Sequence, residues 1–549
     1  MMDLPSCGRS SRKRGSRIAF LISLLGIALS PWTNGWAAEA VPRLDSSFAG
    51  NGISEVPLAE WATSLVVLGD GQIVASSGRV IARFGVNGES PSVCAVPLED
   101  GARAGGSALQ RDGKLLVSVW VEQPSYAASL RRFHVDCSRD EHFGSGGIVA
   151  SKDAWRIAVQ GDGEILLAHS EGYISGGPTL SGVDGVTKDG VPTFSLSGLS
   201  GDIGALLPWR ERRFTVIFNH RQFRPGEVPG FSVRRLTPEG LDRSFLDTFN
   251  TSPFSFATDA VVGPDGAVFT AGGTQVVRFA ATGVRDTNFG TGGVLELGAA
   301  VDRMAVQPDG AIVAVLKRAD GGRSLLRFSH EGRLDEAFSS WGDTVFPVGY
   351  AQRPLAFSAE AKLMLGGSHD GNFSVSRVHV GHAEAVEFYH SVLDHYFMSS
   401  NALEIANLDL GVHRGWARTG RSFSVYGSAD VAAPEARPVC RFYIPPERGD
   451  SHFYPASPEE CAEVIGKVHT DPNYRGYVLE TPSAFYVPLP DRQTGGCRAG
   501  TMPVYRLWNQ RLDSNHAYTT SRTVRQSLIA RGYLPEGYGP DGTVMCALR

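Results

Sequence analysis

Residues 304–314, with the sequence Met-Ala-Val-Gln-Pro-Asp-Gly-Ala-Ile-Val-Ala, place an Asp-Gly pair between two short apolar runs. Asp-Gly between β-forming runs predicts a β-hairpin, because the tight turn needs a positive φ at both central positions. The same pattern occurs at four other places: Asp70-Gly71, Asp112-Gly113, Asp162-Gly163 and Asp265-Gly266. The stretch is therefore one copy of an internal repeat, and the fold follows from that repeat.

Two further phrases recur between these hairpins. The first has the form Asp-x-x-Phe and occurs at residues 45–48, 140–143, 242–245, 286–289 and 335–338. The second precedes a polar turn and occurs as Arg83-Phe84, Arg132-Phe133, Arg235-Leu236, Arg278-Phe279 and Arg327-Phe328. A period of roughly 42 to 55 residues then holds about four short strands, which is the size of one propeller blade.

Seven such units can be counted, two of them degenerate. The fourth has Trp209-Arg210-Glu211-Arg212 in place of Asp-Gly, and the seventh has Glu360-Ala361. We therefore expect a mostly β protein with a β-propeller over residues 42–382. Seven blades are favoured, and six or eight remain possible if a weak unit is miscounted.

These phrases resemble the bacterial delta-60-type repeat, and the resemblance covers residues 44–380. It implies a β-propeller and no chemistry. We read the recurring Asp and Gly as turn residues, because a calcium loop would need several carboxylates at alternating positions. The glycine-rich loops at residues 143–147 and 289–293 are read as connections between blades, because neither carries the Lys-Ser/Thr of a phosphate-binding loop.

The first 40 residues predict a secretory signal. Arg9, Arg12, Lys13, Arg14 and Arg17 precede the apolar residues 18–29, and a small-residue cleavage site follows near Ala37 or Ala40. Twelve apolar residues are too few to span a bilayer, so a signal is favoured over a retained amphipathic anchor. No other stretch resembles a membrane span. We expect a secreted, periplasmic or cell-surface protein.

Removal of this signal changes the charge and the cysteine count. Of the 549 residues, 52 are basic and 57 acidic; cleavage after Ala37 leaves 47 and 56, a net charge of −9, which disfavours nucleic acid as a partner. Six of the seven cysteines remain, and an even number in an exported chain predicts disulfides. Cys94 and Cys137 lie near two successive blade joints and could be linked.

Residues 386–549 form a different module with a three-fold repeat. Each copy has an opening strand, a polar turn, a His-aromatic motif, a serine and a Gly-aromatic pair. The strands are 386–389, 440–443 and 505–508; the motifs begin at His395, His452 and His516; the serines are Ser400, Ser457 and Ser521. Serine before an apolar helical pattern is typical of a helix N-cap. We expect a compact pseudo-three-fold α+β domain.

This module resembles a secreted bacterial domain family of unknown function, whose copies read approximately F-Y-x(n)-D-H-F-Y-T-x-S. The resemblance implies fold and compartment more than activity. By the family pattern, Cys440 should pair with Cys461, and Cys497 with Cys546. The third copy departs from the pattern at Ala517, where an aromatic residue is expected.

The aromatic residues of this module are candidates for sugar binding, because tyrosine and tryptophan faces stack on sugar rings. The candidate ligand-binding residues are Tyr389, His395, Tyr396, Trp416, Tyr443, His452, Tyr454, Tyr477, Trp508, His516, Tyr518 and Tyr533. The alternative interpretation, which we favour, is that they pack in a small symmetric core. A zinc site of three histidines is a third reading, but no local ligand spacing supports it.

The sequence contains none of three common catalytic motifs: it has no H-E-x-x-H, no phosphate-binding loop and no G-x-S-x-G. We assign no catalytic residue, metal or cofactor. The first hypothesis is an exported non-catalytic binding or scaffold protein for cell-wall or extracellular glycans, or for an extracellular protein. The alternatives are a propeller glycosidase or lyase with an accessory module, and a structural cell-surface component.

Overall fold

The computed structural model describes residues 43–122, 126–173, 179–220, 230–250, 256–319, 322–335, 338 and 354–549. The signal expected at residues 1–40 lies outside these ranges. In the described part of the chain, none of the helices has the length and apolar composition needed to cross a membrane.

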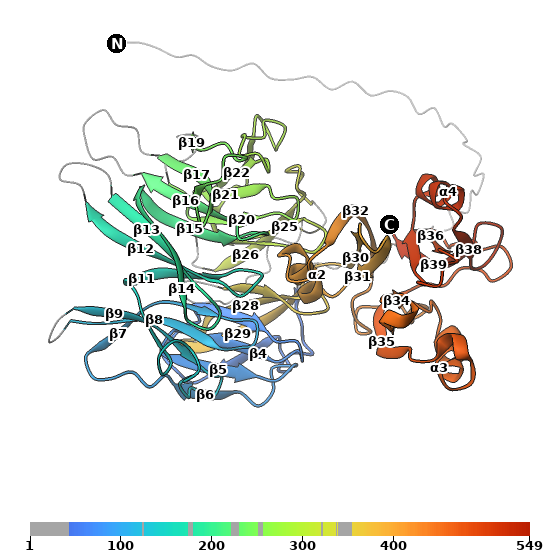
Figure 1. Cartoon of the computed structure of the whole chain (residues 1–549), viewed down its shortest axis with the longest axis horizontal. Helices are drawn as coiled ribbons and strands as arrows, with labels where there is room; N and C mark the ends of the chain where they lie inside the picture. Colours follow the sequence, from blue (N-terminus) through green and yellow to red (C-terminus); the bar gives the residue numbers. More distant parts are fainter. Residues whose placement is uncertain are drawn as a thin grey trace, which may run out of the picture. The chain divides into compact units, whose positions relative to one another are not determined.

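The described residues 43–379 form seven antiparallel sheets (Figure 1). The strands are β1 Arg43–Leu44, β2 Ile53–Val56, β3 Ser64–Val67, β4 Ile73–Ser76, β5 Val80–Phe84, β6 Ser92–Ala95, β7 Ala102–Leu109, β8 Leu115–Val121, β9 Ala127–Phe133, β10 Ile148–Ala150, β11 Ala154–Val159, β12 Ile165–Tyr173, β13 Thr179–Val186, β14 Pro192–Ser200, β15 Asp202–Pro208, β16 Phe214–His220, β17 Gly230–Thr237, β18 Gly240–Leu241, β19 Thr248–Asn250, β20 Asp259–Val262, β21 Val268–Gly272, β22 Gln275–Phe279, β23 Val294–Glu296, β24 Ala300–Val306, β25 Ile312–Lys317, β26 Arg323–Phe328, β27 Leu355–Phe357, β28 Leu363–His369 and β29 Asn372–His379.

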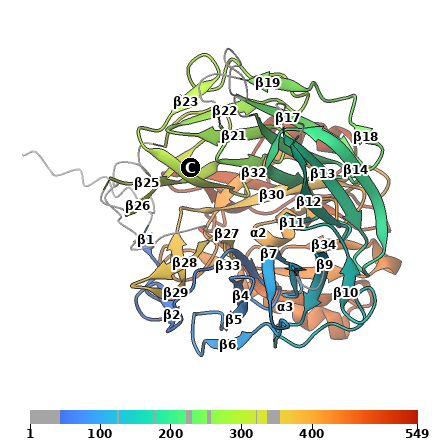
Figure 2. The ribbon, with the colours of Figure 1, turned by 90° about the vertical axis from the view of Figure 1, so that its left-hand side faces the viewer.

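The sheets follow one another round a ring in sequence order (Figure 2). Their first strands contact one another in a closed cycle, β3, β7, β11, β15, β20, β24, β27 and back to β3. This is a β-propeller, as the repeat predicts. The first and last parts of the repeat region share one sheet, because β1 and β2 both pair with β29.

The second strand of each sheet is buried on both faces. In β4 the side chains of Ile73 and Ala75 belong to one apolar cluster, and Val74 between them belongs to the cluster shared with the next sheet. This follows from the alternation of side chains along a strand. The second cluster also contains Cys137, which forms a disulfide with Cys94.

The predicted hairpins are present, but their turns are not of the predicted type. Gly310 in the Asp-Gly pair of the opening stretch has φ +91°, whereas Asp309 is not among the residues with positive φ. The Gly310 amide donates to the Gln307 carbonyl at 2.9 Å, so the turn centres on Pro308 and Asp309 and the glycine follows it. In the degenerate copies Glu211, Arg212 and Ala361 take positive φ without glycine, at 57°, 59° and 60°.

The Asp-x-x-Phe phrase has a role beyond its turn. In the second sheet, Arg132 Nε donates to Asp140 at 2.8 Å, and its guanidinium carbon lies 4.3 Å from the centre of the Phe143 ring. We call this arrangement the Arg-Asp-Phe clamp. Two further clamps are Arg327 with Asp335 and Phe338, and Arg377 with Asp45 and Phe48. The last of these joins the beginning of the repeat region to its end.

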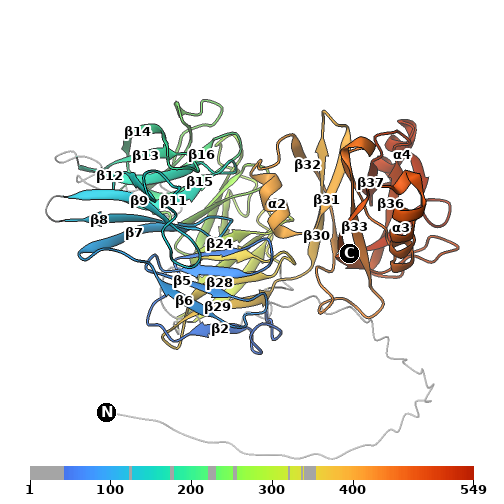
Figure 3. The ribbon, with the colours of Figure 1, turned by 60° about the horizontal axis from the view of Figure 1, so that its bottom comes forward.

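Residues 383–548 form the predicted pseudo-three-fold α+β module (Figure 3). The elements are β30 Ala383–His390, β31 His395–Ser399, α2 Ala402–Asp409, β32 Trp416–Val425, β33 Arg437–Ile444, η1 Pro446–Arg448, β34 Ser451–Phe453, α3 Pro458–Thr470, η2 Pro472–Tyr474, β35 Val478–Val487, β36 Thr501–Trp508, β37 His516–Thr519, α4 Arg522–Ala530, β38 Leu534–Glu536 and β39 Thr543–Leu548. The expected disulfides Cys440–Cys461 and Cys497–Cys546 are both formed. With the first, they indicate an oxidising compartment.

One of the three predicted helix caps is wrong. Ser457 and Ser521 cap α3 and α4, but α2 is capped by Asn401, whose side chain accepts from the amides of Leu403 and Glu404. Ser400 instead donates its hydroxyl to the carbonyl of Ala484 at 2.9 Å.

We expect Asp45→Asn to lower the free energy of unfolding by about 3–5 kcal/mol, because it leaves buried Arg377 without its carboxylate. Asp45 Oδ2 also accepts from Lys362 at 2.9 Å. Burial raises the pKa of Asp45, but hydrogen bonds from Ser47 and Lys362, with the charges of Lys362 and Arg377, outweigh it and hold that pKa well below its usual range. Urea unfolding at pH 7 measures the loss.

The matched control is Asp335→Asn, which breaks the clamp of Arg327. Both side chains of that pair are 20% or more exposed, so we expect a loss of about 1 kcal/mol or less. Equal losses for the two variants would contradict the special role of Asp45.

Candidate functional site

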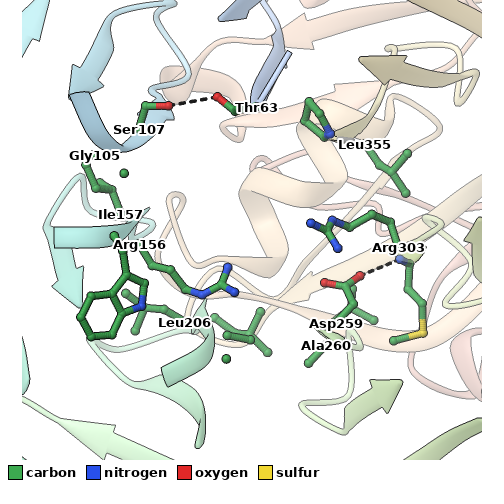
Figure 4. Close-up of a pocket in the computed structure, with 18 of the residues that line it drawn as sticks. Thr63, Gly105, Ser107, Arg156, Ile157, Leu206, Asp259, Ala260, Arg303 and Leu355 are labelled. Carbon is green, nitrogen blue, oxygen red and sulfur yellow. Dashed lines mark hydrogen bonds between the residues drawn. The ribbon is translucent and has the colours of Figure 1, made fainter. Parts of the chain in front are cut away.

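A cavity of ≈ 560 Å³ lies inside the ring of first strands, and we call it the channel pocket (Figure 4). Thr63, Ser107, Arg156, Asp259, Arg303 and Leu355 are among its lining residues. They come from six sheets, so the pocket exists only when the ring is assembled.

Irregular pairing in the first strands occurs at the level of this pocket. The register shifts between Ala104 and Ser107 in β7, Ala154 and Arg156 in β11, Ile203 and Ala205 in β15, and Val301 and Arg303 in β24. A β-bulge bends its strand and redirects a side chain. Gly106 in β7 has no room for a side chain, because a Cβ there would lie 2.6 Å from the backbone of Trp155.

Arg156 and Trp155 are held by the neighbouring sheet. Both Arg156 Nε and Trp155 Nε1 donate to the carbonyl of Ile203, at 3.3 and 3.4 Å. In Figure 4 the guanidinium groups of Arg156 and Arg303 extend into the pocket from opposite sides, with the Asp259 carboxylate close to Arg303. Trp155 is 37% exposed.

Asp259 is the single carboxylate among the lining residues. Its Oδ2 accepts from the amide of Met304 at 2.7 Å. Burial raises the pKa of Asp259 to about 6, although the charges of Arg303 and Arg156 act in the opposite direction. Burial and repulsion by Arg303 lower the pKa of Arg156. The pocket thus holds two guanidinium groups and one carboxylate that ionises near neutral pH, and it carries excess positive charge.

The sequence shows these charged residues only after the copies are aligned. Each of them lies six residues before the aspartate of its own Asp-Gly turn. The pairs are Arg156 and Asp162, Asp259 and Asp265, and Arg303 and Asp309. The repeat is recognised from its turns, and its turn residues do not single out this position.

Four of the residues predicted to bind sugar are buried inside the C-terminal module. His395, Tyr454, Tyr518 and Tyr533 are 5% exposed or less. The Tyr518 hydroxyl donates to the Tyr454 carbonyl at 3.2 Å, and the Tyr454 hydroxyl donates to the carbonyl of Met398. These contacts fit the core interpretation.

His452 and His516 occupy matching positions in the second and third copies. His452 Nε2 lies 3.3 Å from Glu480, and His516 Nε2 lies 3.3 Å from Glu536. Strand pairing places Tyr396 at this position in the first copy. His452 faces Tyr443 and His516 faces Trp508 across their hairpins. In the first copy the residue that faces Tyr389 is Tyr396. The predicted equivalence of His395 with the two histidines is therefore off by one residue.

Each histidine belongs to a cluster built around an arginine. Arg441 pairs with Glu404 and Glu480, both at 2.8 Å, and Arg506 pairs with Glu460 at 2.8 Å and Glu536 at 3.1 Å. In the first copy the charges are exchanged, and Glu387 pairs with Arg421.

The remaining predicted residues form hydrogen bonds or pack within their own copies of the repeat. The hydroxyls of Tyr389 and Tyr443 donate to Asp394 and Asp450, and Trp508 Nε1 donates to Ser514 at 3.0 Å. Trp416 and Tyr477 are partly buried and pack against apolar clusters. The structure thus distributes the twelve residues over three copies and does not gather them in one pocket. Sugar binding by them stays a prediction.

A possible metal cluster consists of Asp45, His379 and Asp430, whose ligand atoms lie within 4.8 Å of one another. Lys362 Nζ contacts Asp45 at 2.9 Å and Asp430 at 3.0 Å, and Arg377 Nε contacts Asp45 at 2.7 Å. The two cationic side chains already balance these carboxylates, so the cluster does not fit a metal ion.

The comparisons with known proteins concern each part separately. A family model described as a domain of unknown function (DUF5648) matches residues 384–541, in agreement with the resemblance of the C-terminal module. No curated protein matches the chain. The delta-60 resemblance of the repeat region stays a prediction.

Solved structures of propellers are similar in outline. Virginiamycin B lyase from Staphylococcus aureus is 11% identical with a TM-score of 0.40, covering 60% of this chain and 99% of that one. The WD40 domain of Neurospora crassa Pan2 is 11% identical with a TM-score of 0.39, covering 58% and 89%. YCF48 bound to D1 peptide is 10% identical with a TM-score of 0.38, covering 62% and 100%. At this identity and TM-score, no activity of these proteins is carried over to this chain.

If the arginine clusters are structural, Arg506→Gln should lower the free energy of unfolding by about 3 kcal/mol or more, because Glu460 and Glu536 lose their buried partner. Arg492→Gln is the matched control. Its pair with Glu459 is more than 60% exposed on both sides, so we expect a change below about 0.5 kcal/mol. Urea unfolding compares the two, and a stable Arg506 variant would show that the cluster is dispensable for folding.

Proposed function

We propose that the protein is exported and that its propeller binds an acidic carbohydrate in the channel pocket. The observation that carries this proposal is the pair of guanidinium groups, Arg156 and Arg303, lining one cavity with a single carboxylate. Among the described residues, neither guanidinium group forms an ion pair with a carboxylate at 4.0 Å or less.

Arginine suits a carboxylate ligand because its planar fork can donate two parallel hydrogen bonds. The concave pocket strengthens the attraction, because low-dielectric walls focus the field of its charges. Asp259 limits this attraction when ionised. An anionic ligand group is therefore the partner that the electrostatics favour.

The other lining groups suit a sugar. Trp155 offers a partly exposed indole beside Arg156, and Thr63, Ser77 and Ser107 line the pocket with hydroxyls. Aromatic faces stack on sugar rings while polar groups bond the hydroxyls. A sugar carrying a carboxylate, such as a uronic acid, combines both requirements. Export places the protein among extracellular glycans that contain such sugars.

A second candidate is a lyase acting on the same ligand, favoured by the raised pKa of Asp259 beside two arginines. A base with a pKa near 6 can remove the proton next to a carboxylate that arginine neutralises, and the departing glycosidic oxygen leaves a carbon–carbon double bond behind. A glycosidase is less suited, because that chemistry uses two carboxylates and only Asp259 lines the pocket. The ultraviolet absorbance of an unsaturated product separates the lyase from simple binding.

We expect Arg303→Gln to weaken binding of oligogalacturonate by roughly 10- to 100-fold, since hydrogen bonds to charged groups contribute about 1.5–3 kcal/mol. Isothermal titration calorimetry of the secreted chain measures the affinity, with the methyl-esterified oligomer as the uncharged ligand. Arg243→Gln is the matched control, because it removes one exposed positive charge of the propeller at a residue that does not line the channel pocket. Absence of binding by the unaltered protein to any acidic oligosaccharide would overturn the proposal.

Binding should also strengthen as the pH falls from 8 to 5. Asp259 is ionised above its pKa of about 6 and protonated below it, while a uronate stays ionised throughout. Protonation removes the one negative charge that faces Arg156 and Arg303, so ligand affinity rises through that range. Asp259→Asn should bind tightly at both pH values, and a pH dependence that survives this substitution would place its origin elsewhere.

A further inference from the structure

The channel of the propeller differs between its two ends. Along the first strands, polar residues such as Arg303 in β24 and Asp259 in β20 line the channel pocket. The last residues of the same strands, Val306 and Val262, line a smaller cavity of ≈ 230 Å³ together with α2. In β20 and β24 the polar residue of the channel pocket and the apolar residue of the small cavity therefore follow one another along the strand.

Helix α2 lies across the apolar end. Pro208, Val262, Val306 and Phe357 from four sheets line the small cavity on the propeller side. Ala402, Ile405 and Ala406 of α2 line it on the other. The helix thus meets strand ends from several sheets at once.

Residues of several sheets form hydrogen bonds or ion pairs with α2 and fix it in this position. The amide of Ala402 donates to the carbonyl of Ala359 at 3.1 Å. At the other end of the helix, Arg210 Nη2 pairs with Asp409 at 3.2 Å, and Arg418 joins Asp409 to the carbonyl of Pro308.

Close packing completes the closure. A Cβ on Gly161 would lie 2.2 Å from the carbonyl oxygen of Leu410, just beyond α2. Leu403 packs against the apolar cluster of the first sheet. Among the described residues, α2 and Leu410 therefore cover the end of the channel where the first strands finish, while a separate cavity of ≈ 580 Å³ lies beside Gly161 and Leu410.

We propose that the channel pocket is blind and binds the terminal acidic residue of a glycan chain, but not its internal residues. The inference rests on the proposed function and specifies its substrate class. A chain that crossed the pocket would need two open mouths, and α2 occupies one of them. A cavity of ≈ 560 Å³ is also on the scale of a small ligand and not of a long polymer segment.

The test uses the full secreted chain and two oligosaccharides of equal length with one uronate each. One carries the uronate at a chain end, and the other carries it between neutral sugars. We expect the terminal isomer to bind at least tenfold more tightly in calorimetry. On polygalacturonate, the number of proteins bound should scale with the number of chain ends.

Two variants distinguish the ends of the channel. Ser77→Trp places a large side chain among the residues lining the channel pocket and should abolish binding. Ala406→Gln adds bulk on α2 at the closed end and should leave affinity unchanged. Ala406 is exposed on the helix, so the substitution is compatible with folding; circular dichroism verifies both variants.

Equal affinity for the two isomers, or several proteins bound along each polymer chain, would overturn end-on binding while leaving acidic-glycan binding intact. Loss of binding in Ala406→Gln would also overturn it, because ligand would then need the α2 side. Failure of both isomers to bind would instead remove the proposed function. A peptide with a terminal carboxylate that binds where the uronates do not would overturn the glycan assignment.

Discussion

The ion pair between Asp45 and Arg377 closes the propeller, and the rest of the structure depends on that closure. Asp45 lies at the start of the described chain, and Arg377 lies in β29 of the last sheet. Pairing of β1 and β2 with β29 covers the outer edge of that strand and makes one sheet from the first and last parts of the repeat region. A buried charge is tolerated only with its partner in place, so a closed ring is strongly favoured over a partly open one. The channel pocket, lined from six sheets, exists only in the closed ring.

In the other two Arg-Asp-Phe clamps, the arginine and the aspartate are close in sequence. Arg132 and Asp140 are eight residues apart, whereas Arg377 and Asp45 are separated by 332 residues. The first Asp-x-x-Phe phrase of the chain is therefore displaced from its own unit and serves the last one. Local clamps can form within a hairpin and its following turn, but the closing clamp must bring distant segments together. One short phrase thus accounts for both the internal order of the sheets and their circular arrangement.

The elements that could be predicted are those specified by local chemistry. Asp-Gly turns between apolar runs identified the hairpins, and Ser457 identified the start of α3. The cap of α2 could not be decided by composition, since Ser400 and Asn401 are both able to cap and tertiary contact with Ala484 draws Ser400 away. The register of His395 depends on the length and geometry of its hairpin turn, and an alignment of the three motifs by residue type does not contain that information. The charged residues of the channel pocket could not be predicted, because a single charged residue in an apolar strand indicates a site only when strands from separate sheets bring several such residues together.

The arginines of the C-terminal module and those of the channel pocket differ in their carboxylate partners. In the C-terminal module, Arg441 and Arg506 each contact two carboxylates. The helix glutamates of this arrangement, Glu404 and Glu460, have no counterpart in α4, where Val524 stands at the same distance from the cap. That difference is consistent with the first copy, which carries Glu387 in place of the arginine and needs no further negative charge. The arginines of these two clusters are therefore neutralised inside the module, and the module's contribution to the channel is the position of α2. The channel pocket holds two arginines and one carboxylate, and this excess of positive charge is why we place ligand recognition there and not on the symmetric aromatic residues.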